Sequence, residues 1–92
     1  MGAVKIFTKK QCPKCPAAQE IGNHLKKEGV MVIDYDLETV EGLAEAAFYG
    51  VMGTPTIIVE DEEENEVMAW RGTVPTPQEI EGLLMANGFF SS

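Results

Sequence analysis

Two runs of β-type residues, separated by one amphipathic segment, restrict the fold of this chain more than any other feature. Residues 4–8 and 30–35 are rich in Val, Ile, Phe and Tyr, as buried strands are. Between them, apolar residues recur at three- and four-residue spacing, which predicts a helix with one buried face. These residues are Cys15, Ala18, Ile21, Gly22 and Leu25. A strand, a helix and a strand in this order predict a parallel βαβ unit.

The limits of this unit follow from its prolines and glycines. We expect the helix to begin at Pro13, because a proline lacks the N–H that has no partner in a first turn. Gly29 is a suitable stop for the same helix. The second strand is apolar along nearly its whole length, which predicts a strand covered on both faces.

Two further helices carry start signals. Thr39 can cap one helix, and Thr76 with Glu79 forms a capping box for another, which is expected to end at Asn87-Gly88. The residues expected to be buried are Leu43, Ala46 and Ala47 in the first and Ile80, Leu83 and Leu84 in the second.

Two more strands, residues 56–59 and 67–71, flank an acidic connection. Residues 60–66 contain six acids, which predicts an exposed hairpin loop that keeps a sheet edge from pairing with other chains. The predicted order is therefore βαβαββα: an α/β fold with a four-stranded mixed sheet and helices on both faces. With 92 residues there is room for one core, so we expect a single domain over residues 1–92.

The only two cysteines, Cys12 and Cys15, stand three positions apart where the first strand gives way to the helix. Such a pair is typical of thiol–disulfide chemistry. The helix N-terminus and the nearby Lys9, Lys10 and Lys14 should lower the pKa of the Cys12 thiol below about 8.5. Cys15 lies on the apolar side and should be more buried, so Cys12 is expected to attack and Cys15 to resolve the mixed disulfide.

The pair is also compatible with two other kinds of site. A structural disulfide across four residues would be strained and would close only a small loop. A metal site needs about four ligands, and the chain offers two cysteines and His24, which we expect to face solvent. A metal or iron–sulfur binding module, bridged across a dimer, stays open as an alternative.

The segment Gly53-Thr54-Pro55-Thr56 is a second candidate feature. A proline directly before a strand can adopt the cis form at little cost. Thr54 could then present its backbone N–H and C=O to an extended partner segment, as in β-addition.

The charge of the chain restricts its partners. The net charge of −8 argues against nucleic acid and anionic membranes. Residues 1–27 nevertheless hold six lysines against one acid, so positive charge is expected around the cysteines. No apolar run approaches the roughly 20 residues of a membrane helix, and the start does not resemble a signal peptide, so a cytoplasmic location is expected.

The combination resembles the thioredoxin-fold superfamily and, within it, the small glutaredoxin-like proteins. Residues 7–15 are similar to the opening of dithiol glutaredoxins, residues 53–56 to the family's cis-proline loop, and residues 70–75 to a segment of the NrdH-redoxins. The resemblance implies a protein dithiol–disulfide oxidoreductase and electron carrier with a redox-active disulfide. It implies that Thr54, Pro55, Gly72 and Lys14 line the partner-docking surface beside Cys12, with Met52 and Val74 as apolar contacts.

The same resemblance implies partners. They are a disulfide-containing target such as ribonucleotide reductase and a thioredoxin-reductase-type flavoenzyme that passes on electrons from NADPH, while the chain itself binds no cofactor and acts as a monomer. Gln11 stands where thioredoxins have a Trp, and the opening strand lacks their buried acid. Gly72-Thr73-Val74-Pro75 stands where glutathione-using glutaredoxins carry two glycines and an acid. We therefore expect a reductase-dependent protein, with a glutathione-dependent glutaredoxin as the alternative.

Overall fold

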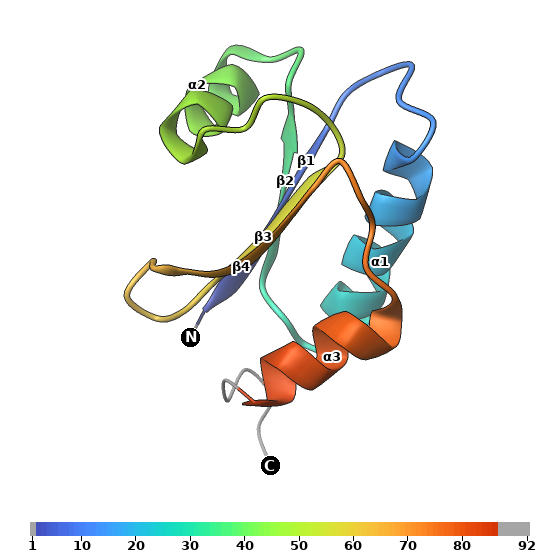
Figure 1. Ribbon diagram of the computed structural model, residues 1–92, viewed down its shortest axis with the longest axis vertical. Coiled ribbons are helices and arrows are strands. Elements are labelled where there is room, and N and C mark those ends of the chain that lie inside the picture. Colours follow the sequence, from blue (N-terminus) through green and yellow to red (C-terminus); the bar gives the residue numbers. More distant parts are fainter. Residues whose placement is uncertain (1, 87–92) are drawn as a thin grey trace.

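A computed structural model describes residues 2–86, and four strands form one sheet between three helices (Figure 1). In chain order the elements are β1 (Ala3–Thr8), α1 (Cys15–Lys27), β2 (Val32–Asp36), α2 (Val40–Tyr49), β3 (Thr56–Glu60), β4 (Glu66–Arg71) and α3 (Pro77–Ala86). The strand order is β2-β1-β3-β4; β1 runs parallel to β2 and antiparallel to β3, and β3 runs antiparallel to β4. The predicted βαβαββα order and mixed sheet are confirmed.

The helices divide between the two faces of the sheet, as expected. Helices α1 and α3 cover one face and α2 covers the other (Figure 1). Successive side chains of a strand point to opposite faces, so Ile6 lies in the core under α1 and α3, whereas Phe7 lies under α2. The larger core consists of Val4, Ile6, Ala18, Ile21, Leu25, Val30, Ile57, Val59, Ile80 and Leu84.

The start of α1 differs from the prediction. The helix begins at Cys15, with Lys14 as its N-cap, so Pro16 and not Pro13 occupies the first turn. Residues 12–15 form a separate turn, in which the Cys15 amide donates to the Cys12 carbonyl over 3.2 Å. The helical pattern could not exclude this turn, because a proline is tolerated both before a helix and within its first turn.

Strand β2 lies at the edge of the sheet, and its two faces are covered only in part: Val32 packs against the core under α1 and α3, and Tyr35 packs against the core under α2. Ile33 and Tyr35 remain partly exposed, and Asp34 is exposed and pairs with Lys26 over 2.6 Å. The parallel pairing with β1 is confirmed, but an apolar run does not distinguish a central strand from the edge strand of a short sheet.

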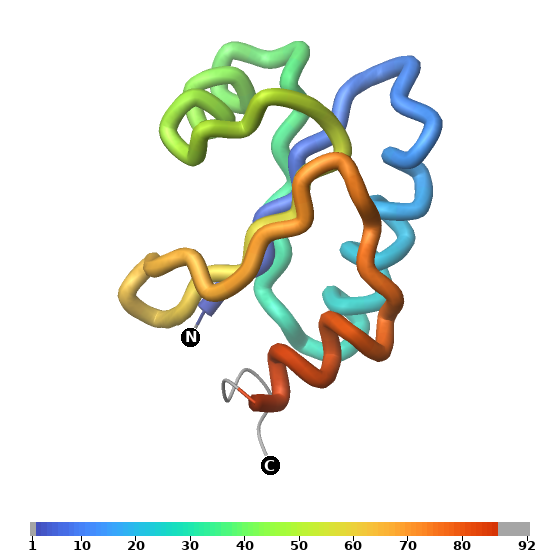
Figure 2. The backbone as a smooth tube through the Cα atoms, in the orientation of Figure 1, coloured from blue at the N-terminus to red at the C-terminus, as the bar shows by residue number. Residues whose placement is uncertain are grey.

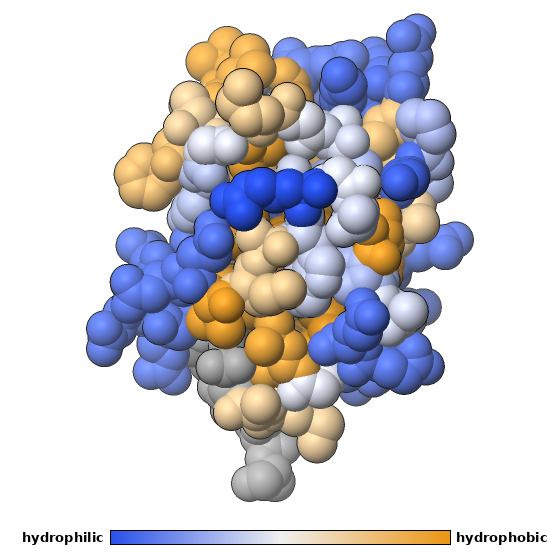
Figure 3. Space-filling model, in the orientation of Figure 1, coloured by the Kyte–Doolittle hydropathy of each residue, from blue (hydrophilic) through white to orange (hydrophobic). Residues whose placement is uncertain are grey.

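The buried face of α2 matches the prediction only in part: Ala46 is buried as predicted. Thr39 caps the helix as expected, accepting from the Gly42 amide over 3.0 Å. Gly42 and Ala46 are buried, whereas Leu43 is 56% exposed and Ala47 is also exposed, so that part of the prediction was wrong. A Cβ on Gly42 would lie only 1.9 Å from the Asp36 carbonyl oxygen. Only a glycine at this position lets α2 lie so close to the backbone at the end of β2. Apolar side chains consequently gather on the surface over α2 (Figure 3).

Helix α3 begins as predicted. The Thr76 amide donates to the Glu79 carboxylate and the Glu79 amide to the Thr76 hydroxyl, each over 3.1 Å, which completes the capping box. Ile80 and Leu84 are buried and Leu83 is half-buried. The predicted stop at Asn87-Gly88 lies outside the described residues. Within residues 2–86, no helix is long and apolar enough to cross a membrane.

Candidate active site

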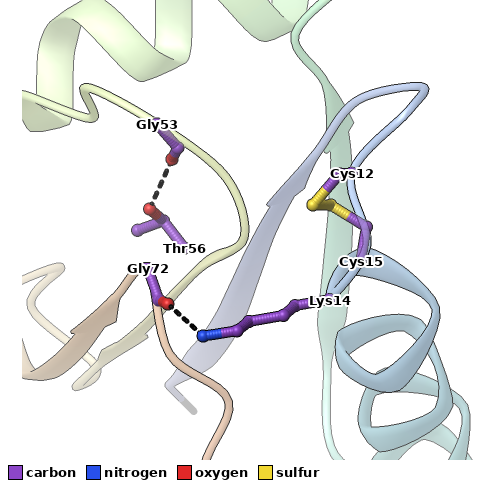
Figure 4. Close-up of a disulfide and its surroundings, with 6 residues drawn as sticks. All are labelled: Cys12, Lys14, Cys15, Gly53, Thr56 and Gly72. Atoms are coloured by element: carbon purple, nitrogen blue, oxygen red, sulfur yellow. Dashed lines mark hydrogen bonds between the residues drawn. A yellow bond between two sulfur atoms is a disulfide. The ribbon is translucent and has the colours of Figure 1, made fainter.

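Cys12 and Cys15 form a disulfide at the N-terminal end of α1 (Figure 4). Their Cα atoms are 5.3 Å apart. Cys12 lies in the turn before the helix and is half-buried, whereas Cys15 is the first helical residue and is 3% exposed. The predicted difference in burial between the two cysteines is confirmed.

The turn that leads into Cys12 contains an unusual backbone conformation. Gln11 has φ of 59°, in the left-handed region that side chains with a Cβ rarely adopt. Such conformations persist where the surrounding structure imposes them, and they cluster at functional sites. The sequence carried no signal for this turn, since glutamine is not among the residues enriched in that region.

Three segments that are distant in the sequence meet at Cys12. A hollow of about 260 Å³ is lined by Cys12, Pro13, Lys14, Thr54, Pro55 and Gly72. The loop before β3 and the loop after β4 both approach the cysteine loop (Figure 2). They are joined by a hydrogen bond of 2.8 Å from the Gly72 amide to the Pro55 carbonyl, and the Thr54-Pro55 bond is cis.

Lys14 spans this hollow. Its side chain extends from the cysteine loop toward the strand end, where Nζ lies 3.5 Å from the Gly72 carbonyl oxygen (Figure 4). Gly72 has φ of +79°, a conformation that favours glycine. Four of the residues predicted for docking, Thr54, Pro55, Gly72 and Lys14, are therefore brought together beside Cys12.

The other two predicted docking residues lie farther out. Met52 is 95% exposed and lines a neighbouring hollow that shares Thr54 and Gly72 with the first. Val74 is half-buried, packs against the main core, and lines a groove between α1 and the start of α3. Val74 does not line the hollow at Cys12.

Comparison with known proteins identifies the family. A model of the thioredoxin domain matches residues 2–85. The chain belongs to the thioredoxin-domain family. A probable thioredoxin from Archaeoglobus fulgidus is 38% identical over 63 residues, which are 67% of this chain and 69% of the relative. A thioredoxin from Methanocaldococcus jannaschii is 29% identical over 62 residues, 66% of this chain and 73% of the relative.

Solved structures agree with this thioredoxin fold. An uncharacterised thioredoxin-like protein from Clostridium perfringens has a TM-score of 0.78 and 26% identity, covering 97% of this chain and 72% of its own. A thioredoxin variant from Halobacterium salinarum has a TM-score of 0.81 at 21% identity, covering 99% of this chain and 78% of its own. With its Cys-x-x-Cys pair, this thioredoxin-family chain is a thiol–disulfide oxidoreductase. The closer resemblance to glutaredoxins stays a prediction.

Fewer lysines than expected lie near the cysteines. Lys9, Lys10 and Lys14 are exposed in the loop around Cys12, and Lys10 pairs with Glu38 over 3.8 Å. The prediction that the lysines of residues 1–27 all surround the cysteines was wrong, because α1 carries Lys26 and Lys27 to its far end and the remaining lysine, in β1, points under α2.

That remaining lysine, Lys5, belongs to a buried network that the sequence did not predict. Its Nζ lies 3.1 Å from the Glu60 carboxylate, and it donates to the Tyr49 hydroxyl, which in turn donates to Glu60. Burial lowers the pKa of Lys5, but the hydrogen bonds to Tyr49 and Glu60 outweigh it and raise the pKa above its ordinary value. Burial and the bond to Glu60 also raise the pKa of Tyr49.

This network changes the interpretation of the acidic segment. The sequence predicts that Glu60 belongs to the exposed hairpin loop, and this is wrong: Glu60 is 2% exposed and is the last residue of β3. The loop that follows is exposed, and hydrophilic atoms cover that region of the surface (Figure 3). Tyr49 is the last residue of α2, so the network fastens the C-terminal end of α2 to the sheet, directly before the loop that carries Thr54 and Pro55.

Proposed function

We propose that this thioredoxin-family chain carries electrons to protein disulfides, with Cys12 as the attacking thiol and Cys15 as the resolving thiol. The observation that carries this assignment is the difference in exposure within one site: Cys12 opens into a shared hollow, whereas Cys15 is buried at the helix start. A target sulfur can reach Cys12, and Cys15 is held close enough to Cys12 to attack it afterwards.

The reaction would proceed in two exchanges. The Cys12 thiolate attacks one sulfur of a target disulfide, which forms a mixed disulfide and releases the other target sulfur as a thiolate. The Cys15 thiolate then attacks the Cys12 sulfur, forms the Cys12–Cys15 disulfide and releases the second target thiolate. Two electrons have passed from the dithiol to the target.

Activation of Cys12 would come from the start of α1 and the neighbouring lysines. Backbone N–H groups at a helix N-terminus favour a thiolate, and Lys9, Lys10 and Lys14 are exposed in the same loop. Pro16 removes one N–H from the first turn, so fewer donors point toward the cysteine than in a helix without it. The pKa of Cys12 is nevertheless expected below that of a free thiol.

Docking would use the hollow at Cys12. An extended target segment could pair with the backbone of Thr54, beside Pro55 and Gly72, while Lys14 lies across the opening. Met52 offers an exposed apolar contact at the edge of this surface. Val74 would contact only a target that extends into the groove between α1 and α3.

For recharging, we favour a thioredoxin-reductase-type flavoenzyme that delivers electrons from NADPH, with no cofactor bound to the chain itself. Ribonucleotide reductase would be one target of this kind, and the protein would act as a monomer in the cytoplasm. The alternative is a glutathione-dependent glutaredoxin. The segment Gly72-Thr73-Val74-Pro75 supports the first choice, because it lacks the two glycines and acid expected of a glutathione site.

One assay separates the two reductants. The oxidised protein is supplied with insulin as disulfide substrate and either NADPH with thioredoxin reductase or glutathione with glutathione reductase and NADPH. We expect NADPH consumption above the protein-free blank with thioredoxin reductase and little with glutathione. Rapid turnover with glutathione alone would overturn the choice of reductant, and turnover with neither system would contradict the electron-carrier proposal.

A further inference from the structure

Three side chains able to bind a metal converge where α1 meets α3, away from the cysteine pair. His24 lies on α1, Glu28 follows one turn later as the C-cap of that helix, and Glu81 reaches them from α3. Among residues 2–86, one group of at least three His, Cys, Asp or Glu residues has all its ligand atoms within 4.8 Å of one another, and it consists of these three. His24 lies nine residues beyond Cys15, which is roughly 13 Å along the helix.

The expectation that His24 faces solvent holds, but its partner could not be foreseen. The side chain is 44% exposed, and its Nε2 is hydrogen-bonded to Glu81 Oε1, whose side chain is 34% exposed. Glu81 is 57 positions away in the sequence, so only the packing of α3 against the face that carries α1 reveals the pair. Helix spacing alone would have placed Glu28 near His24, since residues four apart share a face.

The arrangement of these atoms suits a divalent cation. A cation can take the place of the hydrogen bond between His24 Nε2 and Glu81 Oε1, because the imidazole nitrogen and the carboxylate oxygen then both become ligands. Glu28 supplies a second carboxylate, so the two negative charges would neutralise the charge of the ion. His24 and Glu81 stand on helices, which hold them more closely than loops would, and Glu28 is the residue directly after the end of α1.

We propose that His24, Glu28 and Glu81 bind a first-row divalent transition metal ion such as Zn²⁺, which is the ion used in the test below. An imidazole ligand favours such ions over Mg²⁺ and Ca²⁺, which prefer all-oxygen sites. Three protein ligands leave a coordination position for water. The ion would join α1 to α3 and stabilise the folded state by mass action. The site is separate from the cysteines and does not rest on their proposed function.

The test uses the oxidised protein, in which the Cys12–Cys15 disulfide keeps thiolates from binding the metal. The protein is titrated with zinc chloride, and binding is followed by calorimetry and by the NMR signals of the imidazole. His24 is the only histidine of the chain, so its ring signals report on this site alone. We expect the signals to shift until one equivalent is bound, and Mg²⁺ at the same concentration to leave them in place.

Substitutions then locate the ion. His24→Gln and Glu81→Gln should each weaken Zn²⁺ binding by at least the roughly 10–100-fold that the loss of an outer-shell partner costs. Glu63→Gln removes one carboxylate from the acidic hairpin loop and should leave the affinity unchanged. The proposal is overturned if the ring signals do not move, or if Glu81→Gln binds Zn²⁺ as tightly as the wild type. Weaker binding in Glu63→Gln alone would place the ion at the hairpin and overturn it as well.

Discussion

The buried pair of Lys5 and Glu60 should make a large contribution to the free energy of unfolding, and a single substitution can measure it. Their charged atoms are 3.1 Å apart, and the side chains are only 11% and 3% exposed. Lys5→Met would leave the Glu60 carboxylate buried without a cation. The Tyr49 hydroxyl would remain as its hydrogen-bond donor, so the carboxylate would be partly, not wholly, unsatisfied.

The structure sets the expected magnitude. Removing one partner of a buried pair costs about 3–5 kcal/mol in the free energy of unfolding, and the remaining Tyr49 bond favours the lower end. We therefore expect Lys5→Met to cost about 3 kcal/mol. Replacing both charges with apolar side chains of similar volume is often neutral, but the Tyr49 hydroxyl would then lose both of its partners. With Tyr49→Phe added to remove that hydroxyl, Lys5→Met/Tyr49→Phe/Glu60→Leu should recover to within about 1 kcal/mol of the wild type.

Urea unfolding followed by the fluorescence of Trp70, the only tryptophan, measures these values. At a urea dependence of about 1–3 kcal/mol per molar, the loss in Lys5→Met should lower the midpoint by about 1–3 M. Lys10→Met is the matched control, because Lys10 is 81% exposed, pairs with Glu38 over 3.8 Å, and should contribute less than about 1 kcal/mol. A Lys5→Met variant that costs no more than Lys10→Met would contradict this expectation, as would a triple variant no more stable than Lys5→Met.

Two further outcomes follow from the same geometry. Gly42→Ala should destabilise the protein by at least about 1–3 kcal/mol in urea unfolding, because its Cβ would lie 1.9 Å from the Asp36 oxygen. Gly82→Ala, with no neighbouring atom within 4 Å of the new Cβ, should instead stabilise α3 by about 0.5–1 kcal/mol. Equal effects of the two substitutions would contradict this packing of α2. Stability should also fall as the pH rises above about 10: the unfolded chain loses protons from Tyr49 near 10.0 and Lys5 near 10.5, while the folded chain, with both pKa values raised, retains them. Unfolding curves at increasing pH check this, and Lys5→Met should show a shallower decline.

The main architecture was open to prediction because it depends on local patterns. The spacing of apolar residues along α1, the Thr39 cap and the capping box at Thr76 are signals between near neighbours, and the structure contains all three. The site at the cysteine pair could be predicted for the same reason. Its position at a strand–helix junction follows from adjacent segments, and so does its unequal burial.

The errors concern contacts between elements, which neither the spacing of apolar residues nor the order of charges shows. Apolar residues in α2 predicted a buried Leu43, but the close approach of Gly42 to Asp36 selects another face of the helix. Glu60 stands among five other acids, and nothing in its neighbours distinguishes it as the buried partner of Lys5. The Lys5–Glu60 pair depends on the pairing of β1 with β3, and the charge pattern along the chain does not encode that pairing.

The most direct test of the central claim is the trapping of a mixed disulfide. Reduced Cys15→Ser and Cys12→Ser variants are each mixed with insulin, quenched with acid, and mapped by mass spectrometry. We expect a stable adduct on Cys12 in the first variant and almost none on Cys15 in the second, because Cys15 is 3% exposed. Adducts of equal yield in the two variants, or an adduct on Cys15 alone, would contradict it.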